Sequence, residues 1–313
     1  MDLHALMDSR LVLVTGKGGT GKSTFASAIG SLSAASGRRT IVAEIDSFRT
    51  TLDRTLGVEP KFEPRKVREN LYCCNITWKD ALNDWLRNTI SAEKIVRLIL
   101  KNRVVQLFLD ATPGVRETVV LSRIHALTRE FDQVVVDMPA SGHALSILRV
   151  PHVAISLLGG GPIRERSEEI LELLGDPRST TCIVCLPEEM VVNETIELCQ
   201  KLAQQNPEIQ SPMVILNRAA PPSIGEAEVE LLARLSAQED LDAISEELLL
   251  AGRWESRLEE ATSISSERLS DHSNDRILTI PRLGAMGGMK AGARPIVDQL
   301  QTVLKRAMLR EQR

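Results

Sequence analysis

The stretch LVLVTGKGGTGKST, residues 11–24, decides the fold. A short apolar run, residues 11–15, leads into a glycine-rich loop, and small and apolar residues then recur at helical spacing as far as Gly37. In a phosphate-binding loop of this kind, backbone N–H groups turn inward around the phosphates and the following helix adds its positive N-terminal end. The residues that the spacing requires are Gly16, Gly21, Lys22 and Ser23.

The polar side chains of this loop have predicted roles. Lys22 reaches the β- and γ-phosphates of a nucleotide, and the hydroxyl of Ser23 binds Mg²⁺. We expect the rest of the loop to complete the cradle. The predicted nucleotide-binding residues are Gly16, Gly18, Gly19, Thr20, Gly21, Lys22, Ser23 and Thr24.

A second lysine, Lys17, follows the first glycine, although the spacing of the loop does not require it. From the rim of the loop it could point toward a nucleotide held by a facing subunit, and there neutralise charge on the transferred phosphoryl group as an arginine finger does. The alternative is a solvated surface lysine. Its position alone leaves both interpretations open.

Composition narrows the class of protein. The 313 residues are 43% hydrophobic and 26% charged, as in an ordinary globular chain. A net charge of −4 and an aromatic content of 3% give no case for nucleic-acid binding. The five cysteines include an adjacent pair, the first ten residues lack a signal-peptide pattern, and no apolar run approaches the ~18 residues that cross a bilayer. We expect a cytoplasmic protein.

Strand-like and helical runs alternate along the chain, which predicts an α/β fold with a doubly wound, mainly parallel sheet. We expect a single domain, residues 1–313, with a helical insertion at roughly 54–129 and an acidic helical segment at roughly 225–270. A final helix is predicted at about 294–312. The predicted strands lie within residues 11–15, 39–46, 70–77, 132–143, 152–158, 180–188, 211–219 and 276–284.

Two carboxylates follow predicted strands. Asp46 ends the second strand, at the edge where open α/β sheets bind ligands, and could orient water for attack on the γ-phosphate. Capping of the next helix is its alternative role. Asp137 ends a buried strand in the manner of a Walker B aspartate, and we expect it to hold Mg²⁺ through water.

The loop GKGGTGKST resembles the deviant Walker A motif, KGGxxGK[ST], of the class that contains MinD, ParA, the nitrogenase iron protein and the ArsA-type ATPases. In that class the extra lysine acts across a nucleotide-sandwich homodimer. The resemblance therefore implies that Lys17 acts in trans.

Other segments are similar to the ArsA-type group in particular. DMPASGHALSILRVP, residues 137–151, resembles its switch II, and EIDSFRTTLDRTLG, residues 44–57, resembles its switch I. Asn217 falls where that group places an adenine-binding asparagine, which favours ATP because an amide can pair with the edge of adenine.

The resemblance implies a Mg²⁺-dependent P-loop ATPase that switches as a homodimer across ATP, with Lys17, Lys22 and Asp46 as catalytic residues and Ser23 and Asp137 at the metal. Its client, a protein or membrane partner, is unidentified. Two alternatives stay open: a targeting factor for membrane proteins with slow ATP turnover as its timer, and a MinD- or ParA-like positioning ATPase.

The cysteines depart from the group. Relatives hold zinc with a CxxC pair, but Cys182 and Cys185 lie inside a predicted strand, where residues three apart point to opposite faces. The adjacent Cys73 and Cys74 likewise face opposite ways, so we expect core thiols and no zinc.

Two apolar helical surfaces leave alternatives open. The insertion could form a client groove or ordinary core with Trp78, Trp85, Leu86, Ile90, Ile95, Leu98 and Leu100. The final helix could touch a membrane or dock on the sheet with Val297, Leu300, Leu304 and Met308.

Overall fold

In the computed structural model the described residues are 3–46, 50–89, 102, 114–220, 222, 225–236, 242–274, 276–283 and 294–311. Within these ranges eight strands form one sheet, in the order β3-β4-β2-β5-β1-β6-β7-β8. The strands are β1 Leu11–Thr15, β2 Thr40–Ile45, β3 Arg65–Arg68, β4 Leu71–Ile76, β5 Gln133–Asp137, β6 Ser179–Cys185, β7 Met213–Ala219 and β8 Ile277–Pro281.

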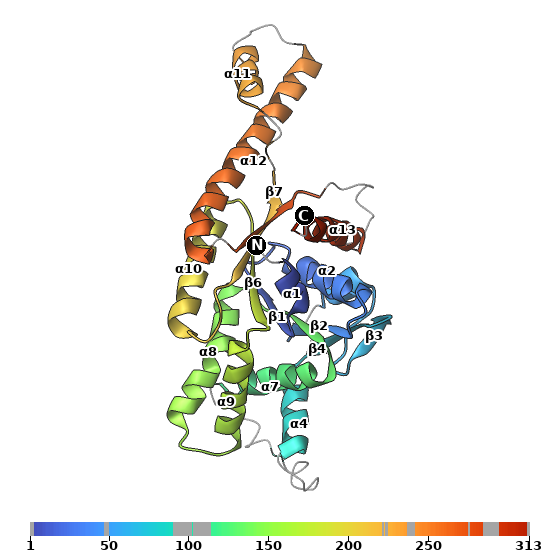
Figure 1. The fold of residues 1–313 in the computed structure, drawn as a ribbon, viewed down its shortest axis with the longest axis vertical. Helices are drawn as coiled ribbons and strands as arrows, with labels where there is room; N and C mark the ends of the chain where they lie inside the picture. The colour runs from blue at the N-terminus through green and yellow to red at the C-terminus, as the bar shows by residue number, and fades with distance from the viewer. Residues whose placement is uncertain are drawn as a thin grey trace.

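Helices connect these strands and cover the sheet (Figure 1). They are α1 Leu3–Asp8, α2 Lys22–Ala35, α3 Leu52–Leu56, α4 Trp78–Thr89, α7 Val115–Glu130, α8 Ser141–Leu157, α9 Pro162–Gly175, α10 Glu189–Gln205, α11 Glu226–Leu235, α12 Ala243–Ser273 and α13 Arg294–Glu311.

The strand pairs are parallel except for β3 with β4. The central strands are apolar almost throughout, because helices cover both of their faces. The chain leaves β1 toward β2 on one side and later places β6 on the other side. The predicted doubly wound sheet is confirmed, and the glycine loop after β1 lies where the strand order reverses, as ligand sites in such sheets do.

Alternate strand residues divide the core between two layers. Leu11 and Leu13 of β1 face the cluster formed with α4, α7, α8, α9 and α10, whereas Val12 and Val14 face the cluster formed with α1, α2, α3 and α13. This period of two is what a strand buried on both faces requires. The two helical layers therefore hold β1 from both sides.

One predicted strand is wrong. Residues 152–158 were expected to be extended, but α8 continues to Leu157 through an internal proline, Pro151. A short apolar run does not distinguish a strand from a helix, and here the run lies at the surface, with Leu157 77% exposed. The predicted insertion range, 54–129, contains the strands β3 and β4 as well as α4 and α7.

The cysteines lie on opposite faces, as predicted. Cys182 and Cys73 belong to the cluster on the α2 side, and Cys185 and Cys74 to the cluster on the α7 side. Burial raises the pKa of Cys182 to about 12 and that of Cys185 to about 11, so both remain protonated thiols at neutral pH. Buried thiols that diverge in this way pack as core side chains.

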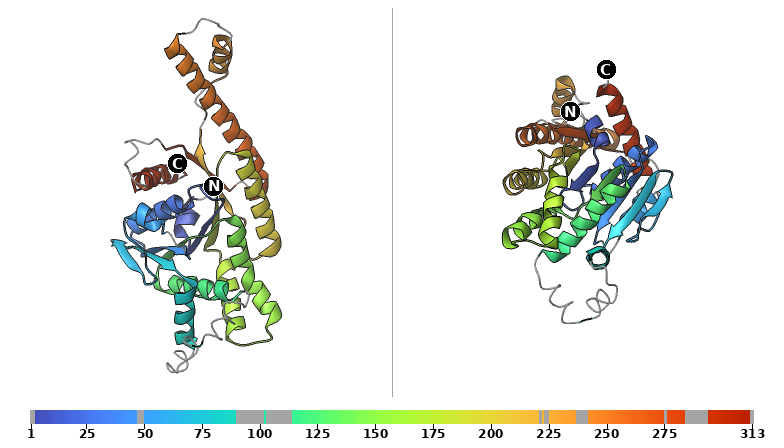
Figure 2. Two further views of the ribbon diagram at one scale, coloured as in Figure 1. Left: turned by 180° about the vertical axis from the view of Figure 1, so that it is seen from behind. Right: turned by 60° about the horizontal axis from the view of Figure 1, so that its bottom comes forward.

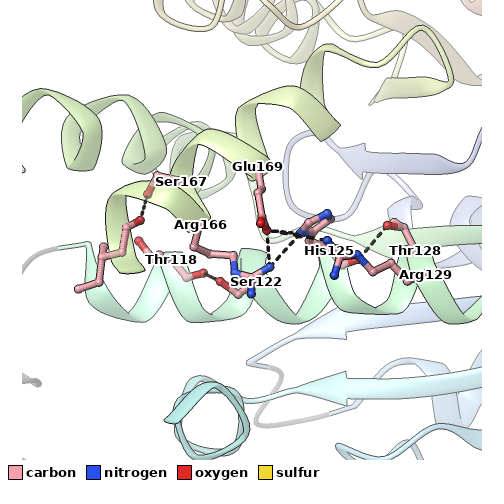
Figure 3. Close-up of polar contacts among 9 residues, drawn as sticks. Thr118, Ser122, His125, Thr128, Arg129, Arg166, Ser167 and Glu169 are labelled. Carbon is pink, nitrogen blue, oxygen red and sulfur yellow. Dashed lines mark hydrogen bonds and ion pairs between the residues drawn. The ribbon is translucent and has the colours of Figure 1, made fainter. Parts of the chain in front are cut away.

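An ion-pair cluster joins α7 to α9 (Figure 3). The carboxylate of Glu169 on α9 lies 2.5 Å from Arg166, 3.5 Å from His125 and 4.0 Å from Arg129 of α7. Burial, and then the charge of Arg129, lowers the pKa of His125. Burial and the nearby guanidinium groups thus disfavour the charged imidazole, and the carboxylate of Glu169 opposes them.

The α11–α12 hairpin projects from the body of the molecule (Figures 1 and 2). The C-terminal half of α12 packs on α10 and β7, and its N-terminal half extends away from the sheet together with α11. Along this projection Ile244, Leu248, Leu250 and Trp254 are 61–73% exposed.

The described helices include none that is long and apolar enough to cross a bilayer.

The described residues bear on part of the two remaining apolar alternatives. In α4, Leu86 is buried and the two tryptophans, Trp78 and Trp85, pack against the core; Ile90, Ile95, Leu98 and Leu100 lie outside the described residues. The final helix α13 packs on α2. It buries Val297, Leu300 and Leu304 there, with Met308 partly covered, so it is a docked helix.

Candidate nucleotide-binding and catalytic site

The glycine loop takes its shape from contacts with the strand beside it. Gly16 has φ +137°, and a Cβ on it would lie 2.3 Å from the carbonyl oxygen of Val184 in β6. Gly19 and Gly21 also have positive φ, a conformation that L side chains rarely adopt. The predicted glycines therefore serve the backbone path of the loop.

The two lysines of the loop point in different directions and have different partners. The hydroxyl of Thr20 donates to the carbonyl of Lys17 at 2.9 Å, and the ammonium of Lys22 donates to the same carbonyl at 3.1 Å. The side chain of Lys17 leaves the loop for α10, where its Nζ lies 3.3 Å from Glu194 Oε2. Lys22 stays at the mouth of its own loop, whereas Lys17 faces outward.

Lys22 is partly buried, and burial lowers its pKa. The negative charges of Asp137 and Glu194 act in the opposite direction. Among the described residues Lys22 has no ion pair within 4.0 Å. A partly desolvated ammonium of this kind is a strong site for phosphate, because the phosphate charge compensates for the lost hydration.

Asp137 lies at the carboxyl end of β5, beside β1, and is 8% exposed. Burial raises its pKa to about 6, although the hydroxyls of Ser23 and Thr51 and the charge of Lys22 act to lower it. Its Oδ1 is buried and accepts no hydrogen bond. The predicted metal residues Ser23 and Asp137 are thus brought together around an unsatisfied oxygen.

Glu44, which belongs to none of the sequence motifs, is a second carboxylate in this cluster. It stands opposite Asp137 in the register of β2 with β5 and is 1% exposed. Its Oε2 accepts hydrogen bonds from the backbone N–H and the hydroxyl of Thr51, at 3.0 and 3.2 Å, while Oε1 is buried without a partner. Burial raises its pKa. The one feature of the sequence that could have indicated this role is a glutamate in a strand whose other residues are mainly apolar.

Asp46 lies immediately beyond β2 in the left-handed region, with φ 44°, and is exposed. Its Oδ1 accepts a hydrogen bond from the backbone N–H of Trp78, the first residue of α4, at 2.9 Å. This contact is with the start of α4 and is not the expected capping of the next helix along the chain, α3, whose N-cap residue is Thr51. Its part in orienting water stays a prediction.

Asn217, at the end of β7, packs directly on the loop. Its Nδ2 donates to the carbonyl of Thr20 at 2.7 Å and lies 2.6 Å from where a Cβ of Gly21 would be. Its Oδ1 accepts from the backbone N–H of Arg218 at 2.9 Å. The structure therefore brings Asn217 to the loop, and its contact with adenine stays a prediction.

The donor set fits Mg²⁺. Ser23, Asp137 and Glu44 supply only oxygens, and the unpartnered Oδ1 and Oε1 are what a hard cation with retained water would satisfy. Within the described ranges no group of three His, Cys, Asp or Glu residues gathers to form a metal cage.

A glycine loop between β1 and α2, a lysine at its mouth and a buried aspartate on the neighbouring strand define a P-loop nucleotide-binding protein, and the additional Lys17 on the rim places it in the deviant Walker A class. The sequence model of a family described as anion-transporting ATPases, the ArsA family, matches residues 9–160 and 162–248. The chain belongs to this family and is an ATPase.

Individual relatives agree with this membership. ATPase BagA of Mycobacterium tuberculosis is 30% identical over 258 residues, which cover 78% of this chain and 74% of the relative. A protein named ATPase ASNA1 homolog, of Babesia bovis, is 29% identical over 246 residues, covering 66% of this chain and 65% of the relative.

Replacement of Gly16 by alanine should destabilise the chain by about 2–5 kcal/mol, because the added methyl group meets the Val184 carbonyl and the backbone conformation disfavours an L side chain. Gly18→Ala is the matched control, since no atom lies within 4 Å of a Cβ there. Urea unfolding of the two variants measures the difference. Equal loss of stability in both would contradict the contact.

Asp137→Asn should raise the free energy of unfolding at pH 8 by about 3 kcal/mol in buffer without Mg²⁺ or nucleotide, because the carboxyl pKa is raised by about two units. The folded pKa lies above the unfolded value, so the cost of burying the ionised carboxylate is fully present above pH ~6 and fades as the pH falls toward ~4. The advantage of the variant should fade with it. Urea unfolding across this pH range measures the effect, and an unchanged stability at pH 8 would argue against it.

Proposed function

We propose that the chain is a Mg²⁺-dependent ATPase whose two copies close on two ATP molecules, with Lys17 of each copy acting on the nucleotide of the other. The observation that carries this proposal is the divergence of the two lysines. Lys22 lies at the mouth of its own loop, while the side chain of Lys17 turns outward to α10 and is 38% exposed. A cation on that rim can reach phosphate held by a facing subunit.

Within one subunit the roles follow from burial and position. The loop backbone and Lys22 bind the phosphates of ATP, and Asn217 at the loop contacts the adenine. Ser23, Asp137 and Glu44 hold Mg²⁺, which when bound neutralises charge on the β- and γ-phosphates. Asp46, exposed just beyond β2, orients the attacking water with its second carboxylate oxygen.

The conformational change that follows hydrolysis would occur in the elements next to these residues. Thr51, which binds Glu44, is the residue before α3. The hydroxyl of Thr15 donates to the carbonyl of Pro139 at 3.2 Å, which ties the end of β1 to the segment before α8. Loss of the γ-phosphate would therefore release α3 and α8 together, as switch segments of nucleotide-driven proteins do.

Two variants that are inactive alone test the shared site. Lys17→Ala leaves its own loop intact but deprives the facing site, and Asp137→Asn disables its own site while keeping Lys17. Mixed in equal amounts, they should recover about a quarter of wild-type ATP hydrolysis, since half of the dimers are mixed and each has one complete site. Phosphate release measures the recovery.

The control for this mixture is Lys17→Ala combined with Lys17→Ala/Asp137→Asn, in which no complete site can form. Full hydrolysis by Lys17→Ala alone would refute the trans role of Lys17. Hydrolysis that the mixture does not restore would refute the shared dimer site.

A nucleotide-gated targeting factor is the second candidate, favoured by the exposed apolar side chains of the projecting hairpin. In this case ATP-driven closure would control binding of a hydrophobic helix from a membrane protein. Fluorescence anisotropy of a labelled hydrophobic-helix peptide should then show at least tenfold tighter binding with a non-hydrolysable ATP analogue than with ADP, and weaker binding by Trp254→Ser. Equal affinity in both nucleotide states would count against this role.

A further inference from the structure

Glu194 joins parts of the site that lie far apart in the sequence. It stands on α10, and its Oε2 lies 3.3 Å from Lys17 Nζ on the rim of the glycine loop. Its other oxygen, Oε1, accepts a short hydrogen bond from the hydroxyl of Ser141, the first residue of α8. One carboxylate therefore holds both the rim lysine and the helix that begins after Asp137.

The hydrogen bond from Ser141 restricts the position of the Glu194 carboxylate. Ser141 is 7% exposed, so its hydroxyl is fixed by burial at the start of α8. Glu194 itself is 35% exposed and Lys17 38% exposed. The hydrogen bond anchors the glutamate from its buried side and leaves the ion pair with Lys17 on the open side, facing the surface on which a second subunit would close.

The lysines of the loop both have partners within the lone chain. The ammonium of Lys22 donates to the Lys17 carbonyl, and that of Lys17 pairs with Glu194. A lysine paired with a carboxylate offers little net charge to a facing phosphate. The pair must part before Lys17 can neutralise charge on the nucleotide of another subunit.

We propose that Glu194 is the positioning residue for Lys17: it holds Lys17 and Ser141 in the single subunit and releases Lys17 when two subunits close on nucleotide. This inference rests on the proposed function, in which Lys17 acts on the ATP of its partner. The exchange is easy because a half-exposed ion pair is weak, whereas a triphosphate offers several negative charges to the same ammonium. When Glu194 loses its contact with Lys17, its hydrogen bond with Ser141 also changes. Binding of the second subunit therefore affects the start of α8.

The same helix supplies a matched control. Glu197, close to Glu194 on α10, pairs with Lys201 at 2.6 Å and lines the same surface hollow. Its pair is more exposed, at 61% for Glu197 and 46% for Lys201, and does not involve Lys17 or Ser141. Glu194→Gln and Glu197→Gln therefore remove equal charge from one surface, and each frees a different lysine.

Lysine acetylation by an N-hydroxysuccinimide ester, read at each site by mass spectrometry on the nucleotide-free chain, tests the holding contact. Glu194→Gln should raise the labelling rate of Lys17 about two- to fivefold and leave Lys201 unchanged. Glu197→Gln should do the reverse. Equal labelling of Lys17 in wild type and Glu194→Gln would overturn the proposal.

Sedimentation with Mg²⁺ and a non-hydrolysable ATP analogue tests the release. Glu194→Gln should lower the dimer dissociation constant by roughly tenfold, since two pairs part in each dimer, and Glu197→Gln should leave it unchanged. In a Lys17→Ala background the effect of Glu194→Gln should vanish. An effect that persists there would assign Glu194 a structural role and overturn the proposal.

The failure of the dimer itself is distinguishable. A wild-type chain that stays monomeric with the analogue would overturn the proposed homodimer and, with it, the release step. The labelling rates, measured on the single chain, would still decide whether Glu194 holds Lys17.

Discussion

The parallel pairing of β1 with β5 on one side and β6 on the other is the interaction on which the site depends. Parallel strands end at a common edge, so this pairing places the glycine loop, Asp137 and the start of α10 within reach of one another. The contact of Gly16 with Val184 shows how closely β6 limits the loop. A shift of β6 by one residue would reverse its faces and remove that contact, which is why the two-sided core and the nucleotide site depend on the same register.

This arrangement requires that charged side chains be buried, which costs them hydration. Lys22, Asp137 and Glu44 all lose hydration, and their pKa values move toward the neutral forms of the side chains. Two buried carboxylate oxygens and a partly buried ammonium are left for a cation and an anion to complete. In the function proposed above, Mg²⁺ and phosphate would bind this site better together than either alone, because each compensates charge that the other leaves.

The sequence predicts best where backbone chemistry is specific. Glycines at fixed spacing between an apolar run and a helix allow few structures, and the loop, the order of the flanking elements and the place of Asp137 are as expected. Apolar runs carry less information: residues 152–158 suit a strand or a helix equally well, and tertiary packing extends α8 through them. The position of Glu44 beside Asp137 depends on β2 pairing with β5 across about ninety residues of chain, which no local pattern encodes. The contact of Asp46 with Trp78 depends likewise on where α4 begins.

The same reasoning explains why Lys17 could be interpreted only partly from its spacing. Its place in the motif puts an ammonium on the rim of the loop, but whether that ammonium is solvated, turned inward or held by the protein depends on α10, which follows it by more than 170 residues. The structure pairs it with Glu194 on a face shared with α8. An ion pair that is partly exposed to water can favour one rotamer of Lys17. It is also weak enough for Lys17 to exchange Glu194 for a more highly charged partner. In the proposed dimer, such a contact would hold Lys17 in the single subunit and let it go when the second subunit binds, without requiring any change in the core.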